Sequence, residues 1–221
     1  MGSPTYAVRA PLARWLRDEA RLAAAREQKP RLLDVGCGVK PYEPFFHGAV
    51  ADYVGVDVAN PAADLDGTVE AIPVDDGSFD IVLCTQTLEH VADPARAIRE
   101  LRRVVARGGR VLASTHGVQV YHPNPDDLWR WTHAGLERLF RENGNWSAVT
   151  VTPGSGTTSA IGMLVATYIH LLAKRMRSPV LAAPLIAAIN ATAAAIDRAV
   201  PRLREPAPGT LFANYHVVAV P

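Results

Sequence analysis

Short apolar segments separated by helical patterns constrain this chain more than any other feature of its sequence. Four of them have the length and composition of strands: Arg31–Val35, Tyr53–Val58, Phe79–Cys84 and Arg110–Ser114. Before the fourth, Pro94–Ala106 has apolar residues at helical spacing, and Gly108 and Gly109 follow its end. Strands that alternate with helices pair in parallel through right-handed crossovers. We therefore predict an α/β fold with a doubly wound, mostly parallel sheet.

The rest of the chain is less regular. The remaining regular elements are predicted as a helix over Thr132–Asn143 and strands over Ser147–Thr152 and Tyr215–Val220. Between those two strands lies an alanine-rich apolar stretch, Ser159–Val200, which is too long for a plain loop. It predicts an inserted cap of two helices that separate near Ser178 and Pro179.

The cap is apolar enough to raise the question of a membrane span. Its second part, Pro179–Ile196, carries no charge, but Pro184, Asn190 and many alanines keep it weakly hydrophobic. The pattern favours a helical pair packed on the domain, or on a second copy of the chain, over membrane insertion. Peripheral membrane contact and a homodimer through the cap both stay open.

Charge and cysteine content narrow the class of partner. The formal net charge is +1 and the arginines are spread along helices, so nucleic acid is not an expected substrate. Cys37 and Cys84 form no closely spaced metal pair; we predict no metal site and interpret both as buried packing thiols. Without a signal-peptide pattern, the chain is expected in the reducing cytoplasm. Its alanine and arginine usage is typical of a GC-rich bacterial genome.

The most informative motif is LLDVGCGVKPY at residues 32–42. A strand ends near Asp34, and Gly36 and Gly38 follow it without a Cβ that would keep the backbone away from a ligand. Asp57 ends the next strand about 20 residues on, where a carboxylate accepts hydrogen bonds from both hydroxyls of a ribose. Together these residues indicate a site for an adenosine-containing cofactor.

A nicotinamide dinucleotide would also satisfy this pair of features. The dinucleotide fingerprint needs a third small residue where a helix packs closely beneath the pyrophosphate, and this chain has Pro41 there. Pro41 therefore disfavours a pyrophosphate. The structural alternative is a simple strand-to-helix turn at Gly36 and Gly38, with Asp57 at a solvated strand end.

Residues 31–115 resemble the class I S-adenosylmethionine-dependent methyltransferases of the small-molecule, methyltransferase-11-like type. The matching pieces follow in family order: LLDVGCGVKPY, YVGVDV, VEAIPVDDGSFDIVLCTQTLEHVADP and LRRVVARGGRVLAST. The resemblance implies an enzyme with a seven-stranded sheet, an antiparallel C-terminal strand and S-adenosylmethionine as its cofactor.

The resemblance also implies cofactor contacts. In chain order they are Asp34, Gly36 and Gly38 on the methionine and ribose side, Asp57 at the ribose hydroxyls, Val69 beside the adenine, and Thr85 and Gln86 at the methionine and sulfonium. Members of the family often have an Asp before the residue that matches Val69, to accept from the adenine amino group, where this chain has Thr68. Either Thr68 or Asp66 is then expected to take that contact.

The acceptor side is predicted at the carboxyl ends of the strands, in residues 114–136. This segment resembles a His, Pro, Asp, Trp, Arg, Thr arrangement found in bacterial methyltransferases associated with glycan and secondary pathways. His116 or His122 is the candidate catalytic base, because an imidazole is partly neutral at working pH. Arg130 would hold an anionic group of the acceptor, and Trp129 would stack on a sugar face or a ring.

A structural interpretation of the same segment stays open. In this interpretation, Asp127 forms a local ion pair with Arg130. Trp129 and Trp131 anchor the core, and Thr132 caps the next helix. His90, which also matches the family, is expected to order local backbone rather than to act in catalysis.

The sequence thus predicts methyl transfer from S-adenosylmethionine to a small-molecule or glycan-type acceptor, including a lipid-linked one, with O-methylation as the working hypothesis. The alternatives are a nucleotide-dependent oxidoreductase and a non-catalytic binding protein of the same fold.

The length of 221 residues suits one domain with an insertion. The expected layout is an N-terminal helical segment at 1–30, a cofactor-binding half at 31–115, and a substrate side at 116–221 that includes the cap at 159–200. The N-terminal helix is predicted over Tyr6–Gln28, with a break at Pro11.

Overall fold

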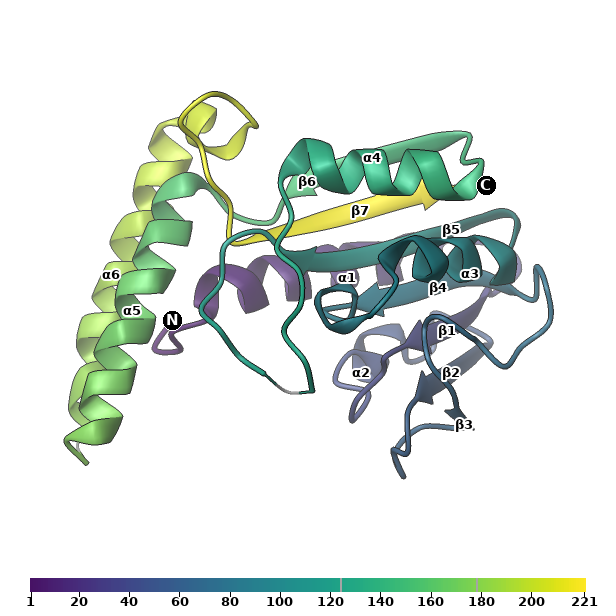
Figure 1. Cartoon of the computed structure of the whole chain (residues 1–221), viewed down its shortest axis with the longest axis horizontal. Coiled ribbons are helices and arrows are strands. Elements are labelled where there is room, and N and C mark those ends of the chain that lie inside the picture. Colours follow the sequence, from purple (N-terminus) through teal and green to yellow (C-terminus); the bar gives the residue numbers. More distant parts are fainter. Residues whose placement is uncertain (124, 178) are drawn as a thin grey trace.

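The computed structural model describes residues 1–123, 125–177 and 179–221. Its centre is a seven-stranded sheet with strand order β3-β2-β1-β4-β5-β7-β6 (Figure 1). The strands are β1 (Arg31–Val35), β2 (Asp52–Asp57), β3 (Leu65–Asp66), β4 (Phe79–Thr85), β5 (Val105–His116), β6 (Ala148–Pro153) and β7 (Asn214–Val220). Strands β1 to β5 pair in parallel, and β7 runs antiparallel to both β5 and β6. The predicted doubly wound, mostly parallel sheet with an antiparallel C-terminal strand is confirmed.

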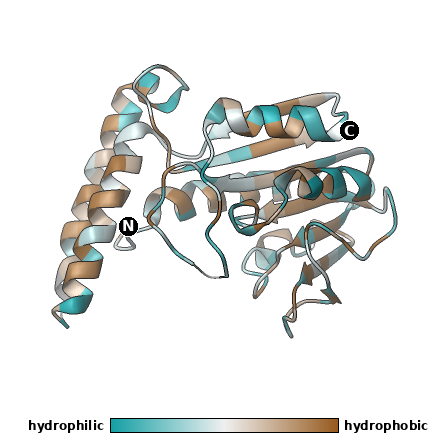
Figure 2. Ribbon diagram, viewed as in Figure 1, coloured by the Kyte–Doolittle hydropathy of each residue, from teal (hydrophilic) through white to brown (hydrophobic). Residues whose placement is uncertain are grey.

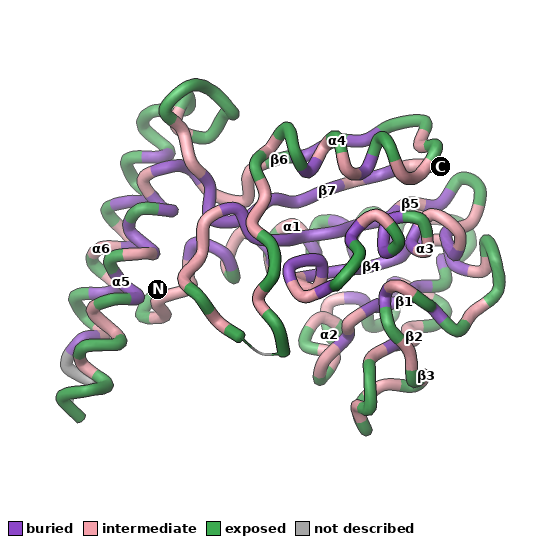
Figure 3. The backbone as a smooth tube through the Cα atoms, viewed as in Figure 1, coloured by how far each residue is buried: buried purple, intermediate pink, exposed green. Residues whose placement is uncertain are grey.

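Strand β4 divides the interior into two cores, one on each face of the sheet. Its residues Ile81 and Leu83 join the first core, and Val82 and Cys84 join the second. All four are completely buried, and Figure 3 shows β4 and β5 as buried along most of their length. A central parallel strand is covered on both faces, which explains its continuous apolar sequence.

Helices cover both faces of the sheet. They are α1 (Tyr6–Ala24), α2 (Glu43–Phe46), α3 (Pro94–Val104), α4 (His133–Gly144), α5 (Thr157–Arg175) and α6 (Pro179–Ala199), with short 3₁₀ turns η1 (Leu88–His90) and η2 (Pro201–Arg204). α1 and α2 pack on the face of Ile81, whereas α3 and α4 pack on the face of Val82. Crossovers on both faces are what a doubly wound sheet requires.

The N-terminal helix corrects one prediction. α1 continues through Pro11 without a break, and it ends at Ala24 rather than Gln28. A proline in a helix gives up one backbone hydrogen bond. Leu12 and Leu16 follow Pro11 in the helix and are almost completely buried against the sheet. Their packing therefore outweighs the loss of one backbone hydrogen bond.

The end of α3 corrects a second prediction. The helix stops at Val104, and β5 begins at once with Val105 paired to Phe79, five residues before the predicted start of that strand. A Cβ at Gly109 would lie 2.6 Å from the carbonyl oxygen of Asp80. The glycine pair therefore allows β5 to approach β4 closely, where the two strands also shift in register, instead of only ending a helix.

Helices α5 and α6 form the predicted insert as an antiparallel hairpin at one end of the sheet (Figure 1). The expected separation falls partly on Ser178, which lies outside the described residues. Both helices are rich in hydrophobic residues (Figure 2), and α5 exposes an apolar stripe at helical spacing: Ile161, Val165, Tyr168 and Leu172. Among the described residues, no helix combines the length and the hydrophobicity that crossing a membrane requires.

One buried carboxylate closes the base of this hairpin. Asp197, near the end of α6, accepts hydrogen bonds at 3.0 Å from the backbone N–H groups of Thr158 and Ser159 in the first turn of α5. Earlier in α6, Asn190 donates to the carbonyl oxygens of Met1 and Ser3 at 2.7 and 3.0 Å. The hairpin is therefore fixed both to itself and to the N-terminus.

Candidate active site

The polar residues predicted from the sequence gather at the carboxyl ends of β1, β2, β4 and β5. This edge of a parallel sheet is where ligands bind in doubly wound folds. The edge has two parts, which we call the cofactor end (the turns after β1 and β2) and the acceptor end (β4, η1, β5 and the loop after β5).

The turn after β1 needs glycine for two separate reasons. Gly36 and Gly38 both have left-handed φ angles, +73° and +53°. At Gly36 a Cβ would also clash with the side chain of Thr87, whereas at Gly38 nothing lies within 4 Å of the Cβ position. The open space at Gly38 is the cradle that a ligand approaching the backbone would use.

Asp57 binds the backbone of the turn directly, and its predicted contact with the ribose stays a prediction. Its Oδ2 accepts from the backbone N–H of Gly38 at 2.8 Å, and its Oδ1 accepts from the N–H of Val58 at 2.8 Å. Asn60, which sequence reasoning missed, donates to Asp57 at 3.0 Å and to the carbonyl of Gly38 at 2.7 Å. Its position three residues past the strand end was the only available signal.

Asp34 is the most unusual residue of the cofactor end. It is 1% exposed, its Oδ2 accepts from the hydroxyl of Tyr53 at 2.6 Å, and its Oδ1 is buried without a hydrogen-bond partner. Burial raises the pKa of Asp34 to about 6, against the opposing effect of the Tyr53 hydrogen bond. A free carboxylate oxygen in this position suits a positively charged amino group, such as that of S-adenosylmethionine.

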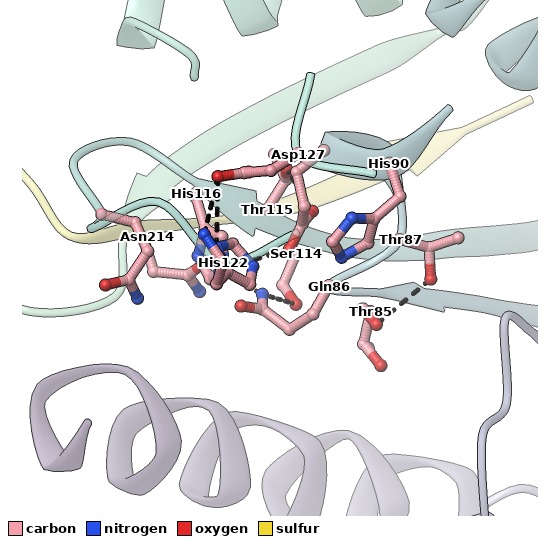
Figure 4. A network of polar contacts seen from close by, with 12 residues as sticks. Thr85, Gln86, Thr87, His90, Ser114, Thr115, His116, His122, Asp127 and Asn214 are labelled. Atoms are coloured by element: carbon pink, nitrogen blue, oxygen red, sulfur yellow. Dashed lines mark hydrogen bonds and ion pairs between the residues drawn. The ribbon is translucent and has the colours of Figure 1, made fainter. Parts of the chain in front are cut away.

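Gln86 follows β4 and joins it to the neighbouring strands β5 and β7. It has a left-handed φ of +55°, and its side-chain amide donates to Ser114 at 2.9 Å and to Asn214 at 3.0 Å (Figure 4). Thr85 beside it is buried at the end of β4. Asn214 lies far along the chain on β7, so no local pattern could have identified this contact.

The residues expected beside the adenine are Val69, Thr68 and Asp66, and each has a local partner or a place in the core. Val69 is buried in the core on the α3 side, and Thr68 is exposed and pairs with Ala71 in a short bridge. Asp66 accepts at 2.8 Å from the backbone N–H of Ala59. The adenine contacts of Thr68 and Val69 therefore stay predictions.

The acceptor end is a cluster of three imidazoles around a buried carboxylate. The ring of His122 lies 5.0 Å from that of His116 and 5.4 Å from that of His90, measured between centroids (Figure 4). Oε1 of Glu89 lies 3.1 Å from Nε2 of His116, and Oε2 accepts at 2.8 Å from the hydroxyl of Thr115. Sequence reasoning quoted Glu89 only as part of a matching motif and missed its place in the site.

Burial favours the neutral forms of the two closest groups. It raises the pKa of Glu89, and it lowers the pKa of His116 to about 3 with a further contribution from His122. His116 is thus an uncharged imidazole at neutral pH. His90 contacts the backbone carbonyl of Asp126, which is the ordering role expected of it.

The loop after β5 is held by the ion pair of the structural interpretation. Arg130 binds both carboxylate oxygens of Asp127 at 2.5 and 2.7 Å, and it also donates to the carbonyls of Gln119 and Val120. The guanidinium holds the pKa of Asp127 well below its usual range. The same carboxylate accepts from the backbone N–H of His122 at 3.0 Å. This pair positions the candidate base.

The tryptophans and the predicted cap also have local partners. Trp129 donates to the carbonyl of Val91 at 2.8 Å and stacks on Trp131, with ring centroids 5.6 Å apart. Trp131 packs against the core on the α3 side, and Thr132 caps α4 by accepting from the N–H of Gly135 at 3.1 Å. Trp129 remains 37% exposed, so part of its ring is available to a ligand.

A cavity of about 420 Å³ lies in front of the cluster. Glu89, His116, His122 and Gln86 line one side, and the residues that line the other come mainly from α1, among them Val8, Arg9 and Leu12. The cavity therefore has polar and apolar walls, and it begins at the residue expected to border the sulfonium.

Comparison with known proteins places the chain among methyltransferases. The family described as a methyltransferase domain matches residues 7–147. The ubiquinone biosynthesis O-methyltransferase of Ralstonia nicotianae is 34% identical over 46% of this chain and 47% of its own length. The ajmaline N-methyltransferase of Rauvolfia serpentina is 30% identical over 62% of this chain and 53% of its own length. The chain spans about half the length of the curated relatives it matches.

A solved structure supports the fold. The YcgJ protein from Bacillus subtilis superposes with a TM-score of 0.52 over 92% of this chain and 96% of its own, at 20% identity. At that identity the likeness shows the fold alone.

Proposed function

The chain belongs to the class I S-adenosylmethionine-dependent methyltransferases, and from this premise we propose that it methylates a hydroxyl oxygen of a small-molecule or glycan-type acceptor. The observation that carries the proposal is the shared cavity: Gln86, which is expected to border the sulfonium, lines the same space as His116 and His122. A hydroxyl bound there would lie between the methyl donor and an uncharged imidazole.

Two carboxylates of the cofactor end support the proposal that S-adenosylmethionine binds there. Asp57 would accept from a ribose hydroxyl at Oδ1, which has a lone pair beyond its hydrogen bond from Val58, whereas Oδ2 already accepts from Gly38 and Asn60. The unpartnered Oδ1 of Asp34 would accept from the amino group of the methionine part. The cofactor supplies an activated methyl group on its sulfonium.

The acceptor end would orient the hydroxyl and remove its proton. His122 is the better proton acceptor of the two candidates, because burial depresses the pKa of His116 to about 3 while His122 is part-exposed on its loop. The Asp127–Arg130 pair holds that loop in place. Alignment of donor and acceptor contributes most of the rate in such displacements, and the cavity walls supply it.

The cavity favours an acceptor with an apolar part and an anionic or polar part, because Val8 and Leu12 stand beside Arg9. Two relatives are named for acceptors with ring systems, ubiquinone intermediates and ajmaline. Their oxygen and nitrogen chemistry differs, so the choice of oxygen here rests on the histidines.

Calorimetric titration with S-adenosylmethionine, S-adenosylhomocysteine and NAD tests the first half of the proposal. We expect the first two to bind and NAD not to bind. Binding of NAD alone would support the oxidoreductase, and no binding of any of the three would support the non-catalytic protein.

Transfer of a labelled methyl group tests the second half. A set of hydroxylated acceptors is compared with the matched amines, and His122→Ala is compared with the exposed control His47→Ala. Label on the amines alone, or full activity of His122→Ala, would contradict the proposed oxygen chemistry or the proposed base.

A further inference from the structure

Glu89, His116 and His122 have a spacing that proton transfer alone does not explain. Each offers a ligand atom, and the three atoms lie within 4.8 Å of one another. Two imidazoles and one carboxylate form a ligand set typical of zinc and related divalent ions. The three residues come from η1, the end of β5 and the loop beyond it, so only the fold brings them together.

The closest pair already has the separation of two ligands on one ion. Oε1 of Glu89 and Nε2 of His116 lie 3.1 Å apart. Two ligands at about 2.1 Å from a tetrahedral ion would lie about 3.4 Å apart. The pair needs little movement to share a cation, and the ligand atom of His122, which lies on a loop, is within 4.8 Å of both.

Two buried polar atoms of the cluster lack a hydrogen-bond partner. They are Oε1 of Glu89 and Nδ1 of His116. Glu89 is 0% exposed, and the guanidinium of Arg130 is engaged by Asp127 and backbone carbonyls. A buried carboxylate without a counter-charge is costly, and a bound cation would relieve that cost.

The surroundings resemble the outer shell of a metal site. Oδ2 of Asp127 lies 3.5 Å from Nδ1 of His122, which leaves the other ring nitrogen free to bind. Thr115 donates to the second oxygen of Glu89 at 2.8 Å. Metal-binding histidines and carboxylates are usually held in this way by a second set of side chains.

We propose that Glu89, His116 and His122 bind one divalent transition-metal ion of the zinc class, with a free coordination position facing the acceptor cavity. All three residues line that cavity. Three protein ligands with an open position are the arrangement of catalytic rather than structural zinc sites.

The role of the ion rests on the proposed function, although its binding does not. A hydroxyl oxygen of the acceptor would take the open position, where its O–H proton is lost more readily to solvent and the electron pair stays on oxygen. That oxygen then forms the new O–CH₃ bond as the S–CH₃ bond of the donor breaks and its electron pair returns to sulfur. Bound in this way, His122 acts as a ligand instead of a base.

Equilibrium dialysis against zinc chloride, after treatment with a chelator, measures binding without any activity assay. We expect one equivalent bound by the wild type and by His47→Ala, which removes an exposed histidine outside the cluster. His116→Ala and His122→Ala should each weaken binding at least about tenfold. Cobalt(II) in place of zinc should give a visible absorption band in the wild type that is lost in both variants.

Two outcomes would overturn the proposal: less than stoichiometric zinc in the wild type, or equal binding by the wild type and His122→Ala. Glu89→Gln is a third variant, and its folding is checked by circular dichroism. If Glu89→Gln does not fold, His122→Ala still tests the proposal, because His122 lies on a loop. Titration of the same samples with S-adenosylmethionine separates the two hypotheses. Cofactor binding without zinc contradicts only the metal site, and zinc binding without cofactor contradicts only the proposed function.

Discussion

The cofactor end and the acceptor end lie at one edge of one sheet but are built differently. At the cofactor end, the contacts join neighbouring strand ends through backbone N–H groups, as between Gly38 and Asp57. At the acceptor end, they join side chains from distant parts of the chain, as between Glu89 and Thr115 or between Gln86 and Asn214. A backbone cradle suits a constant cofactor, and a side-chain cluster on a loop suits an acceptor that varies between relatives.

This difference implies that substitutions at the two ends have separate effects. Changes at the cofactor end should affect stability and cofactor affinity, whereas changes at the acceptor end should leave the cofactor bound and reduce transfer. The following variants test that separation.

The largest effect is expected from Gly36→Ala. The new Cβ would clash with Thr87 and force an alanine to a φ of +73°, so we expect a loss of about 3 kcal/mol or more in the free energy of unfolding. Gly38→Ala meets no atom within 4 Å and should lose only about 1 kcal/mol. Urea denaturation compares them, and equal losses would show that the clash is relieved by movement of Thr87.

Asp57→Ala should come next. Removal of a carboxylate that accepts from Gly38, Val58 and Asn60 should cost about 1.5–3 kcal/mol of cofactor binding, or roughly tenfold to a hundredfold in affinity. Asp75→Ala removes an exposed carboxylate outside the candidate site and is the matched control. Calorimetry with S-adenosylhomocysteine measures both, and unchanged affinity in Asp57→Ala would contradict its assignment to the ribose.

Arg130→Gln tests the acceptor end. The loop loses its two-point contact with Asp127, so methyl transfer should fall more than about tenfold while cofactor affinity stays within about twofold. Arg138→Gln, which breaks an exposed pair with Glu142, is the control and should change neither quantity. Loss of cofactor affinity in Arg130→Gln would mean that the two ends are coupled.

Asp34 gives the cofactor end an opposite pH dependence for stability and for binding. Burial raises its pKa to about 6 in the folded protein, so its favourable contribution to stability is present below the unfolded pKa and is lost as pH rises through about 6. Binding of an ammonium group needs the ionised carboxylate, so affinity should instead fall as pH drops through about 6. Both trends should be absent in Asp34→Asn, compared by denaturation and calorimetry at pH 5 and 7.

The smallest effect concerns the thiols. Cys37 and Cys84 are free and buried, and burial raises the pKa of Cys37 to about 11 and that of Cys84 further. We expect neither to react with a thiol reagent at pH 8 until the protein is unfolded. Rapid labelling of the native protein would show that the turn after β1 opens.

The sequence predicts most of the fold because apolar periodicity is a local signal. Five strands were placed within one residue at each end, whereas β5 begins five residues earlier than predicted. The errors arose where tertiary packing outweighs a local rule, as at Pro11 in α1. The two-residue β3 and the single turn of α2 are too short to have a periodicity, and the sequence alone did not indicate them.

The candidate site likewise contains residues that the sequence could suggest and residues that depend on tertiary contacts. Asp34, Gly38 and Asp57 could be proposed from the sequence because their spacing follows from strand length. Glu89 could not be proposed in this way, because its role in the site depends on its contact with His116. The pairing of β4 with β5 brings these two residues together. No rule of spacing contains that information.

The carboxylate of Asp197 has a consequence for how this chain can change. It joins the first turn of α5 to the last turn of α6, so the whole hairpin enters and leaves the sheet at one point. The cost of closing a loop depends only weakly on its length. Whole helical turns can therefore be added to or removed from the tip of the hairpin while β6 and β7 keep their register, which lets the outer surface of the protein evolve separately from its catalytic edge.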